Sequence, residues 1–390
     1  MAKTITFFDF ANLNYGGGCE KNFMKLGNWL SKKGYKVSFI TASKNLNDQF
    51  SKTLSSQNYT KNISDKEIKE KFGVLNYETF ELKDLIFPTK KRKILRNILK
   101  KSDSIVSKNE IFEVVILKIL LNIPSNKIIL GFHTPIHYPV IKSKKAKLHN
   151  LVYNSKIYSF LLSNSKVRCL VLNSHERDLL KKLGINKNIE VIPNPIDVKK
   201  FSLKKYKKGK KMKIYYIGRM NEAKGIDTLY KCILKISKQV EFKEIEFYFV
   251  GNGEEEHYLK KLSKEFKNCF FIGFKPDVKK FYQNSDLIIV PSRWEGFPYV
   301  VLEAQSTGTP VITTNTPGCR DIVIDKRTGW IVETDNVNIM SNKIIETFYL
   351  WKNYYEKFKK VGLNARKNVY EKYEEEKINL KLEKFISNGK

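Results

Sequence analysis

The chain has 390 residues, of which 42% are hydrophobic and 13% aromatic, so its length suits two domains and its composition excludes a disordered tail. The formal net charge is +32 and the pI is about 9.7. This charge favours anionic partners such as nucleic acid, anionic lipid or phosphorylated substrates, although solvated lysines in a lysine-rich composition would give the same value.

Short β-rich runs alternate with longer helical patterns along the whole chain. The runs in the first half lie at 4–10, 36–41, 127–132, 167–174 and 189–193. Those in the second half lie at 213–218, 245–251, 269–274, 286–292, 310–314 and 329–332. Between them, residues such as Phe23, Leu26 and Leu30 fall on one face of a helix. This alternation predicts an α/β fold with parallel sheets covered by helices on both faces.

A lysine-dense segment with few apolar residues interrupts the series and divides the chain into two halves. We therefore predict a first Rossmann-like domain at 1–195, a linker at 196–212 and a second Rossmann-like domain at 213–362. A C-terminal helix at 363–390 is expected to pack back toward the first domain. Two doubly wound domains facing across a cleft would bind ligands at the carboxyl ends of their strands.

The five cysteines show no CxxC pair and no metal-ligand spacing with the five histidines. They predict reduced thiols in a cytosolic protein, with neither a disulfide framework nor a zinc site. The N-terminus is too short and too polar for a signal peptide. The most apolar window, 111–130, includes Glu113, Lys118 and Pro124, so we expect no membrane-spanning helix.

Two loops carry features suited to a phosphorylated ligand. The sequence GGG at 16–18 lies between the first strand and the first helix, where glycines let backbone approach a ligand, although a tight turn would also use them. In the second half, Arg219 ends a strand and Lys224 leads into the next helix. Two cations at a strand's carboxyl end can neutralise a pyrophosphate.

The stretch RWEGFPYVVLEAQSTG, from residue 293, combines a loop with a helix. Pro298 suits the first turn of a helix that ends at Gly308. The backbone amides of Phe297, Tyr299 and Val300 would then form an anion site. Glu295 precedes that site, and Glu303 in the second turn can point back toward it. A sugar and a ribose that flank a diphosphate fit this arrangement, whereas the alternative is a surface loop with a capping glutamate.

With these motifs in order, the chain resembles the retaining glycosyltransferases of family 4 (glycosyl transferases group 1), which have the GT-B fold. The resemblance runs through GGGCE at 16–20, FHTP at 132–135 and VIPNPID at 191–197. It continues through GRMNEAKGID at 218–227, VGNGEEE at 250–256, GF at 273–274 and SRWEGFPYVVLEAQSTGTPVI at 292–312. The two glutamates separated by seven residues around Gly-Phe-Pro are its most specific element.

The resemblance implies a role for each matched residue. Arg219 and Lys224 would hold the donor diphosphate, Glu303 the ribose, and Glu295 the hydroxyls of the donor sugar. The remaining donor-site positions would be Gly17, Gly18, Gly218, Gly296, Phe297, Tyr299 and Val300. His133 would lie beside the transferred sugar, so His133, Glu295, Arg219 and Lys224 form the expected catalytic set.

The implied reaction transfers a hexose-type sugar from a nucleoside-diphosphate sugar to a hydroxyl group, with the anomeric configuration kept. No Asp-x-Asp pair occurs, so we expect neither a metal nor another cofactor. The lack of an obvious nucleophile favours same-face attack over a covalent intermediate. Asn194-Pro195 departs from the family's usual Asn-Gly and could stiffen the junction between the domains.

Two basic segments in the first half suggest where the acceptor lies. The segment 83–102 has Ile94, Leu95, Ile98 and Leu99 at helical spacing, and 141–162 is a second basic stretch. Basic amphipathic helices bind anionic membranes, although ordinary surface helices have the same pattern. We therefore expect a cytoplasmic enzyme, peripheral on the cytoplasmic face of the membrane, that extends a glycan or lipid-linked glycan.

Two rival functions remain open from the residues alone. One is another GT-B enzyme: a sugar-nucleotide epimerase would need no acceptor, and a phosphorylase would need free phosphate. A polyanion-binding or nucleic-acid-binding protein would explain the charge, but it would leave the ordered loops unexplained, and no nucleic-acid motif occurs. We therefore expect no nucleic-acid partner.

Overall fold

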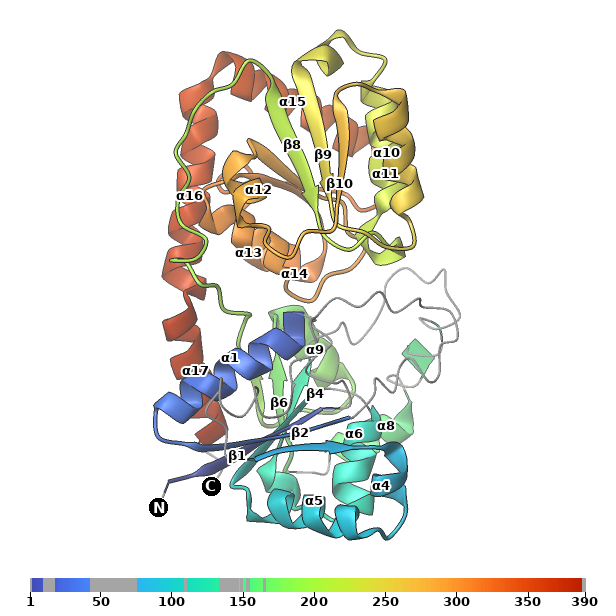
Figure 1. The fold of residues 1–390 in the computed structure, drawn as a ribbon, viewed down its shortest axis with the longest axis vertical. Coiled ribbons are helices and arrows are strands. Elements are labelled where there is room, and N and C mark those ends of the chain that lie inside the picture. Colours follow the sequence, from blue (N-terminus) through green and yellow to red (C-terminus); the bar gives the residue numbers. More distant parts are fainter. Residues whose placement is uncertain are drawn as a thin grey trace. The chain divides into compact units, whose positions relative to one another are not determined.

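The computed structural model describes residues 2–9, 18–42, 76–108, 111–132, 147, 150–151, 155–163 and 166–387. These residues form two compact units (Figure 1). The first unit comprises the described residues up to Ile192 and those from Asn379 onward, and the second comprises Pro193–Ile378. Each unit is built on its own parallel sheet, so the prediction of two doubly wound α/β domains is confirmed.

The first sheet has the strand order β3-β2-β1-β4-β5-β6-β7, and all its strand pairs are parallel. Its strands are β1 (Thr4–Asp9), β2 (Lys36–Ala42), β3 (Asn76–Phe80), β4 (Ser104–Lys108), β5 (Ile128–Phe132), β6 (Arg168–Val171) and β7 (Ile189–Val191). The order reverses between β1 and β4, as in doubly wound folds. Two strands, β3 and β4, lie outside the runs that the sequence predicts.

Successive residues of β1 serve the two faces of this sheet, because side chains alternate along a strand. Phe7 stacks on Phe39 with ring centroids 5.0 Å apart and also contacts Phe23 of helix α1 (Gly18–Lys32). Phe8 points the other way and stacks on Phe80 at 5.5 Å, within the main core cluster. Phe23, Leu26 and Leu30 are all buried, so the predicted face of α1 is confirmed.

Further helical elements of the first unit lie within the described residues. They are α4 (Leu82–Ile86), α5 (Lys90–Lys101), α6 (Ile111–Val115), a π-helix η2 (Ile116–Leu120), a 3-10 turn η3 (Ser125–Lys127), α8 (Lys156–Ser163) and α9 (Ser174–Lys182). Leu95 and Leu99 of α5 are fully buried in the core, whereas Ile94 is 52% exposed. Most of the predicted apolar stripe of α5 therefore faces the protein core.

The second sheet has the order β10-β9-β8-β11-β12-β13 and is also parallel throughout. Its strands are β8 (Met212–Ile217), β9 (Ile245–Val250), β10 (Cys269–Gly273), β11 (Leu287–Val290), β12 (Val311–Thr314) and β13 (Trp330–Val332). Each lies within or beside a predicted run. The order reverses between β8 and β11, so the loops that follow these two strands are neighbours.

Helices cover both faces of the second sheet (Figure 1). One face carries α10 (Ile226–Ile236) and α11 (Glu256–Glu265), and the other carries α12 (Lys279–Asn284) and α13 (Tyr299–Ser306). The remaining elements are η4 (Glu222–Lys224), η5 (Val240–Glu244), α14 (Pro317–Ile322), α15 (Val337–Asn353) and α16 (Tyr355–Tyr373). Helix α15 packs against α10, and α16 packs against α13.

The segment predicted as a linker, 196–212, contains core residues, contrary to the expectation that it is almost devoid of them. Ile196, Val198 and Phe201 are 3%, 6% and 5% exposed. The Phe201 ring meets Tyr282 edge-on with centroids 5.9 Å apart. Lys204 is also buried and donates from Nζ to the Ser285 carbonyl at 2.5 Å. The few apolar residues stand among many lysines, so the composition of the segment did not reveal that they are buried in the second unit.

The C-terminal helices are shared between the two units. Helix α16 continues without a break past residue 362, and α17 (Glu375–Ser387) follows it after a single residue, Glu374. The first turn of α17 belongs to the second unit, and its residues from Asn379 onward belong to the first. In the described part of the chain, no helix is long and apolar enough to cross a membrane.

Candidate active site

The residues that the sequence singles out in the second unit lie in the loops that follow β8 and β11 and in the first turns of α13. Gly218 follows β8, and its amide donates to the Val250 carbonyl at 3.0 Å. Gly251 follows β9 with φ +135°, and a Cβ there would lie 1.9 Å from the Gly218 carbonyl oxygen. Glycine at 251 is therefore required for these two loops to lie side by side.

The loop that carries Lys224 packs directly on the loop that carries Glu295. Gly225 has φ +63°, and a Cβ at this position would come within 2.2 Å of the Pro291 carbonyl oxygen. Lys224 donates from Nζ to Glu295 Oε1 at 2.6 Å. The structure thus brings together two predicted site residues that are 71 positions apart in sequence.

Glu295 is held from a second side as well. Its side chain is 9% exposed, and Oε1 also accepts a hydrogen bond from the Ser292 hydroxyl at 2.7 Å. No residue in the described part of the chain bonds to Oε2. This oxygen is therefore available to accept a hydrogen bond from a hydroxyl group of a ligand.

Helix α13 begins directly after these residues and presents its amino end to the same loops. Its N-cap residue is Pro298, whose side chain offers no capping acceptor. Among the described residues, the amide of Val300 donates no hydrogen bond, as the sequence predicts for a helix start. The positive end of the helix dipole is thus available to an anion at this place.

Phe297 does not point freely into the loop region. It is 5% exposed, its ring meets Tyr373 edge-on at 5.3 Å, and its carbonyl accepts from Asn194 Nδ2 at 2.8 Å. Gly296 lies between Phe297 and Glu295, and its carbonyl oxygen would be 2.1 Å from a Cβ on Gly318. Packing from several elements therefore fixes the backbone of this loop.

Glu303 has a partner that the sequence did not indicate. Its Oε2 accepts a hydrogen bond from the Tyr282 hydroxyl at 2.7 Å, and Tyr282 is only 1% exposed. Burial and the Glu303 carboxylate raise the pKa of the Tyr282 phenol well above its usual value, so this hydroxyl remains a donor. Tyr282 therefore fixes the direction of one oxygen of Glu303.

Arg219 is exposed, and within the described residues its guanidinium forms neither an ion pair nor a hydrogen bond. Its backbone carbonyl accepts from the Tyr216 hydroxyl at 2.6 Å. Burial, followed by the charge of Glu295, raises the pKa of the Tyr216 phenol well above its usual value. Arg219 thus has a fixed backbone and a side chain that can turn toward a ligand.

The predicted residues of the first unit are mostly outside the described part of the chain. Gly17 and His133 lie outside it, and Gly18 is the first residue of α1. The basic stretch 141–162 also lies largely outside. The roles implied for these residues remain predictions.

Sequence reasoning overlooked Arg293, which lies within the quoted RWEGFP stretch. Its guanidinium, 2% exposed, pairs with Asp227 at 2.6 Å and with Asp335 at 2.9 Å. No local pattern signals these pairs, because the acids lie 66 and 42 positions away. Tyr282 was overlooked for the same reason, since it lies 21 positions from Glu303, whereas Ser292 lies only three positions from Glu295.

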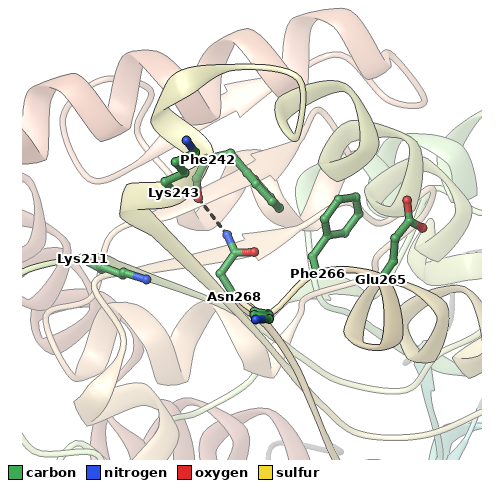
Figure 2. A pocket seen from close by; sticks show the side chains of 7 residues that line it. Lys211, Phe242, Lys243, Glu265, Phe266 and Asn268 are labelled. Carbon is green, nitrogen blue, oxygen red and sulfur yellow. Dashed lines mark hydrogen bonds between the residues drawn. The ribbon is translucent and has the colours of Figure 1, made fainter.

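A surface hollow of about 320 Å³ lies elsewhere on the second unit (Figure 2). It is lined by Lys211, Phe242 and Asn268 among others, and Asn268 donates to the Phe242 carbonyl at 2.8 Å. Lys211 precedes β8 and Asn268 precedes β10, so the hollow lies at the amino ends of these strands. Ligands of doubly wound sheets bind at the opposite edge, where the predicted residues gather.

Comparison with known proteins gives matches over most of the chain. The family model of glycosyl transferases group 1 matches residues 197–368, and that of glycosyltransferase family 4 matches residues 16–200. An uncharacterized glycosyltransferase of Haemophilus influenzae is 28% identical over 344 residues, which cover 87% of this chain and 88% of that protein.

Two further matches are informative. The UDP-Gal:alpha-D-GlcNAc-diphosphoundecaprenol alpha-1,3-galactosyltransferase of Escherichia coli is 27% identical over 230 residues, which cover 55% of this chain and 58% of that protein. The crystal structure of Anabaena HepE in complex with UDP has a TM-score of 0.72 at 16% identity and covers 98% of this chain and 99% of that chain. At that identity the structural match shows a shared fold.

Proposed function

Because the chain belongs to the GT-B glycosyltransferases of group 1 and family 4, we propose that it moves a hexose-type sugar from a nucleoside-diphosphate sugar to a hydroxyl group, with retention of configuration. The observation that carries this proposal is the Lys224–Glu295 pair, 2.6 Å apart, beside the uncapped amino end of α13. A cation, a carboxylate and a helix start suit a ligand that has both phosphates and hydroxyls.

The donor diphosphate would bind to Arg219, Lys224 and the amino end of α13. Arginine can form two parallel bonds to phosphate oxygens, lysine acts as a point charge, and the helix dipole adds positive potential. These groups would stabilise the negative charge that develops on the leaving nucleoside diphosphate. They supply positive charge without a metal ion, so we propose that the transfer is metal-independent. Because no residue stands out as a nucleophile, we propose that the acceptor attacks on the same face.

The two glutamates would bind hydroxyl groups on either side of the diphosphate. Glu295 would accept from the donor sugar through Oε2, since Oε1 already accepts from Lys224 and Ser292. Glu303, whose Oε2 accepts from the Tyr282 hydroxyl, would accept hydrogen bonds from the ribose. His133 would lie beside the transferred sugar, as the family resemblance implies.

A first experiment measures nucleotide binding by thermal shift with UDP, GDP, ADP and their common sugar conjugates, without added metal. A ligand at about 100 times its dissociation constant should raise the apparent stability by roughly 2.7 kcal/mol. We expect one nucleotide family to stabilise the wild type, and Lys224→Met and Glu303→Ala to lose most of that shift.

Lys264→Met is the matched control, because Lys264 is an exposed lysine on α11 of the same unit. Its shift should equal that of the wild type. The panel includes a DNA and an RNA oligonucleotide. If these shift the protein and no nucleotide does, the transferase proposal is wrong and the positive charge serves polyanion binding.

We further propose that the acceptor is a glycan or lipid-linked glycan and that the enzyme works peripherally on the cytoplasmic face of the membrane. The E. coli relative, whose name describes an acceptor on diphosphoundecaprenol, supports a lipid-linked acceptor. The four cysteines whose side chains the structure describes are free and buried, in keeping with a reducing compartment.

The surface that would meet the membrane lies around α4, α5 and η2. Helix α5 has the sequence KKRKILRNILKK, and Ile86, Phe87 and Ile119 are 45%, 59% and 61% exposed. The Arg92 guanidinium donates to the carbonyls of both Ile86 and Leu120, so these exposed apolar side chains belong to neighbouring segments. Exposed apolar groups among lysines suit an anionic bilayer surface.

Flotation with anionic vesicles at low salt tests this surface. We expect the wild type to float and the double variant Phe87→Ser/Ile119→Ser to float several-fold less. Val240→Ser is the control, because Val240 is 82% exposed but lies in the second unit. A wild type that stays in the lower fractions at low salt would overturn the membrane proposal without affecting the donor proposal.

A further inference from the structure

Arg293 is the most fully bonded buried cation of the second unit within the described residues. Its Nε donates to Asp335 Oδ2 at 2.9 Å, and one terminal nitrogen donates to the Glu222 carbonyl at 2.8 Å. The other donates to Asp227 Oδ1 at 2.6 Å and to the Thr228 hydroxyl at 3.3 Å. Four of its five N–H donors are engaged this way and its side chain is only 2% exposed, so Arg293 is not placed to bind a substrate phosphate directly.

The partners of Arg293 come from three separate parts of the chain. Glu222 belongs to the loop after β8, Asp227 and Thr228 to the first turn of α10, and Asp335 to the loop after β13. Thr228 also donates to Asp335 Oδ1 at 2.7 Å. One guanidinium therefore ties the loop that carries Lys224 to two other elements.

The backbone of Arg293 is also hydrogen-bonded next to the proposed donor site. The Arg293 amide donates to the Ala223 carbonyl at 2.8 Å, and Ala223 is the residue before Lys224. Glu295, which accepts from Lys224, is two residues after Arg293. Arg293 thus bonds to Ala223, directly before Lys224, and to Asp227, three residues after it, while its own loop carries Glu295.

Lysine could not replace arginine here. The four acceptors lie around a planar group whose donors point in fixed directions, whereas an ammonium is a single point with three donors. The two carboxylates also neutralise the guanidinium, so its charge does not compete with Lys224 for a phosphate. Burial lowers the pKa of Arg293, but the hydrogen bonds and charges of Asp335 and Asp227 together raise it further, so the guanidinium is always charged.

We propose that Arg293 is a positioning residue that clamps the loop after β8 onto the loop after β11. The clamp fixes the positions of the Lys224 ammonium and the Glu295 carboxylate relative to each other, as donor binding requires. This inference rests on the proposed function for its consequence in donor binding. The clamp itself is a property of the protein without any ligand.

The clamp is tested without a ligand by measuring how fast each lysine of the full-length protein is acetylated by an N-hydroxysuccinimide ester, with peptide mass spectrometry. Lys224 is 28% exposed and paired, so it should react slowly in the wild type. In Arg293→Met we expect its rate to rise about fivefold or more relative to that of Lys264. Arg293→Lys should show the same rise, and Asp335→Asn an intermediate one.

Donor binding is tested on the same variants with the nucleotide that stabilises the wild type. Arg293→Met should raise the dissociation constant about tenfold, a loss of one order of magnitude in affinity. In the double variant Arg293→Met/Lys224→Met, the loss should be clearly smaller than the product of the single losses, since both act through one group.

The outcomes distinguish a positioning role of Arg293 from a role in protein stability alone. If Arg293→Met and Asp335→Asn lower the melting temperature but leave both the Lys224 rate and nucleotide affinity unchanged, the proposal is overturned. If no nucleotide binds the wild type, the proposed function fails, while the acetylation rates still decide whether Arg293 fixes Lys224. Asp335→Asn leaves the bonds of Arg293 to Glu222, Asp227 and Thr228 in place, so this variant remains informative if Arg293→Met does not fold.

Discussion

Each unit buries an arginine, and the two arginines have opposite surroundings. In the first unit, Arg168 donates to the Phe385 carbonyl at 2.5 Å and to Ser104 Oγ at 3.2 Å, so its partners are neutral. In the second unit, Arg293 pairs with two carboxylates. Burial lowers the pKa of Arg168, whereas carboxylate hydrogen bonds raise that of Arg293.

The difference corresponds to what each arginine holds. Arg168 donates to carbonyls near the end of α17. The last four carbonyls of a helix receive no hydrogen bond from within the helix, so Arg168 satisfies acceptors that burial would otherwise leave unpaired. Arg293 joins loops at the carboxyl edge of a sheet, beside the proposed donor site. A neutral set of acceptors suits attachment of a terminal helix, and paired charges suit the fixing of loops that must present another cation.

The largest effect is expected from removing the carboxylates around Arg293. Asp227→Ala/Asp335→Ala leaves a buried guanidinium without a counter-charge, which should lower the free energy of unfolding by about 3 to 5 kcal/mol. Urea unfolding in a Trp29→Phe background reports on this unit, because the other tryptophans, Trp294, Trp330 and Trp351, all belong to it.

The matched control for this change is Glu346→Ala/Glu356→Ala, which removes two acids that are 62% and 79% exposed. Its effect should stay within about 0.5 kcal/mol. A loss below about 1 kcal/mol for the pair around Arg293 would mean that its carboxylates are not needed, and the contrast with Arg168 would disappear.

Lys204 is a third buried cation that sharpens the comparison, because its bonded partner is a carbonyl. Burial lowers its pKa from 10.5 to about 8, although Asp286 acts in the opposite direction. At a pH between these two pKa values, the unfolded chain binds more protons than the folded one, so the free energy of unfolding should rise with pH. The rise should amount to about 3 kcal/mol between pH 8 and 10.5.

Urea unfolding of the wild type and Lys204→Met across this pH range measures that rise as the difference between the two proteins. The variant should lack it, because methionine does not titrate. Tyrosines with raised pKa values change the stability of both proteins by the same amount, so their contribution cancels in the difference. If the difference between the two proteins is independent of pH from 8 to 10.5, Lys204 is solvated and does not belong with the buried cations.

The smallest effect is expected for Ser104→Ala in the first unit. Ser104 Oγ donates to the Ile386 carbonyl at 2.7 Å and accepts from Arg168, so its loss removes neutral hydrogen bonds only. We expect a cost of about 1 kcal/mol, seen as faster amide hydrogen exchange in the last turns of α17. Ser263→Ala, which removes a serine bond within α11, should leave that exchange unchanged.

The sequence alone predicted most of the strands, because apolar runs and their alternation with helices are local features. It missed β3 and β4, whose five-residue sequences NYETF and SIVSK each contain three polar residues. Strand β4 is nevertheless central, between β1 and β5. Its burial follows from its neighbours in the sheet, which no short window of sequence can report.

The proposed site divides in the same way. The sequence pointed to Lys224 and Glu295 separately, since each follows a strand and precedes a helix, but their ion pair depends on β8 and β11 being adjacent in the sheet. The partners of Glu303 and Arg293 were likewise hidden. Local pattern determined the elements and the residue types at their ends. The order of the strands, which depends on long-range pairing and packing, decided which of those residues meet.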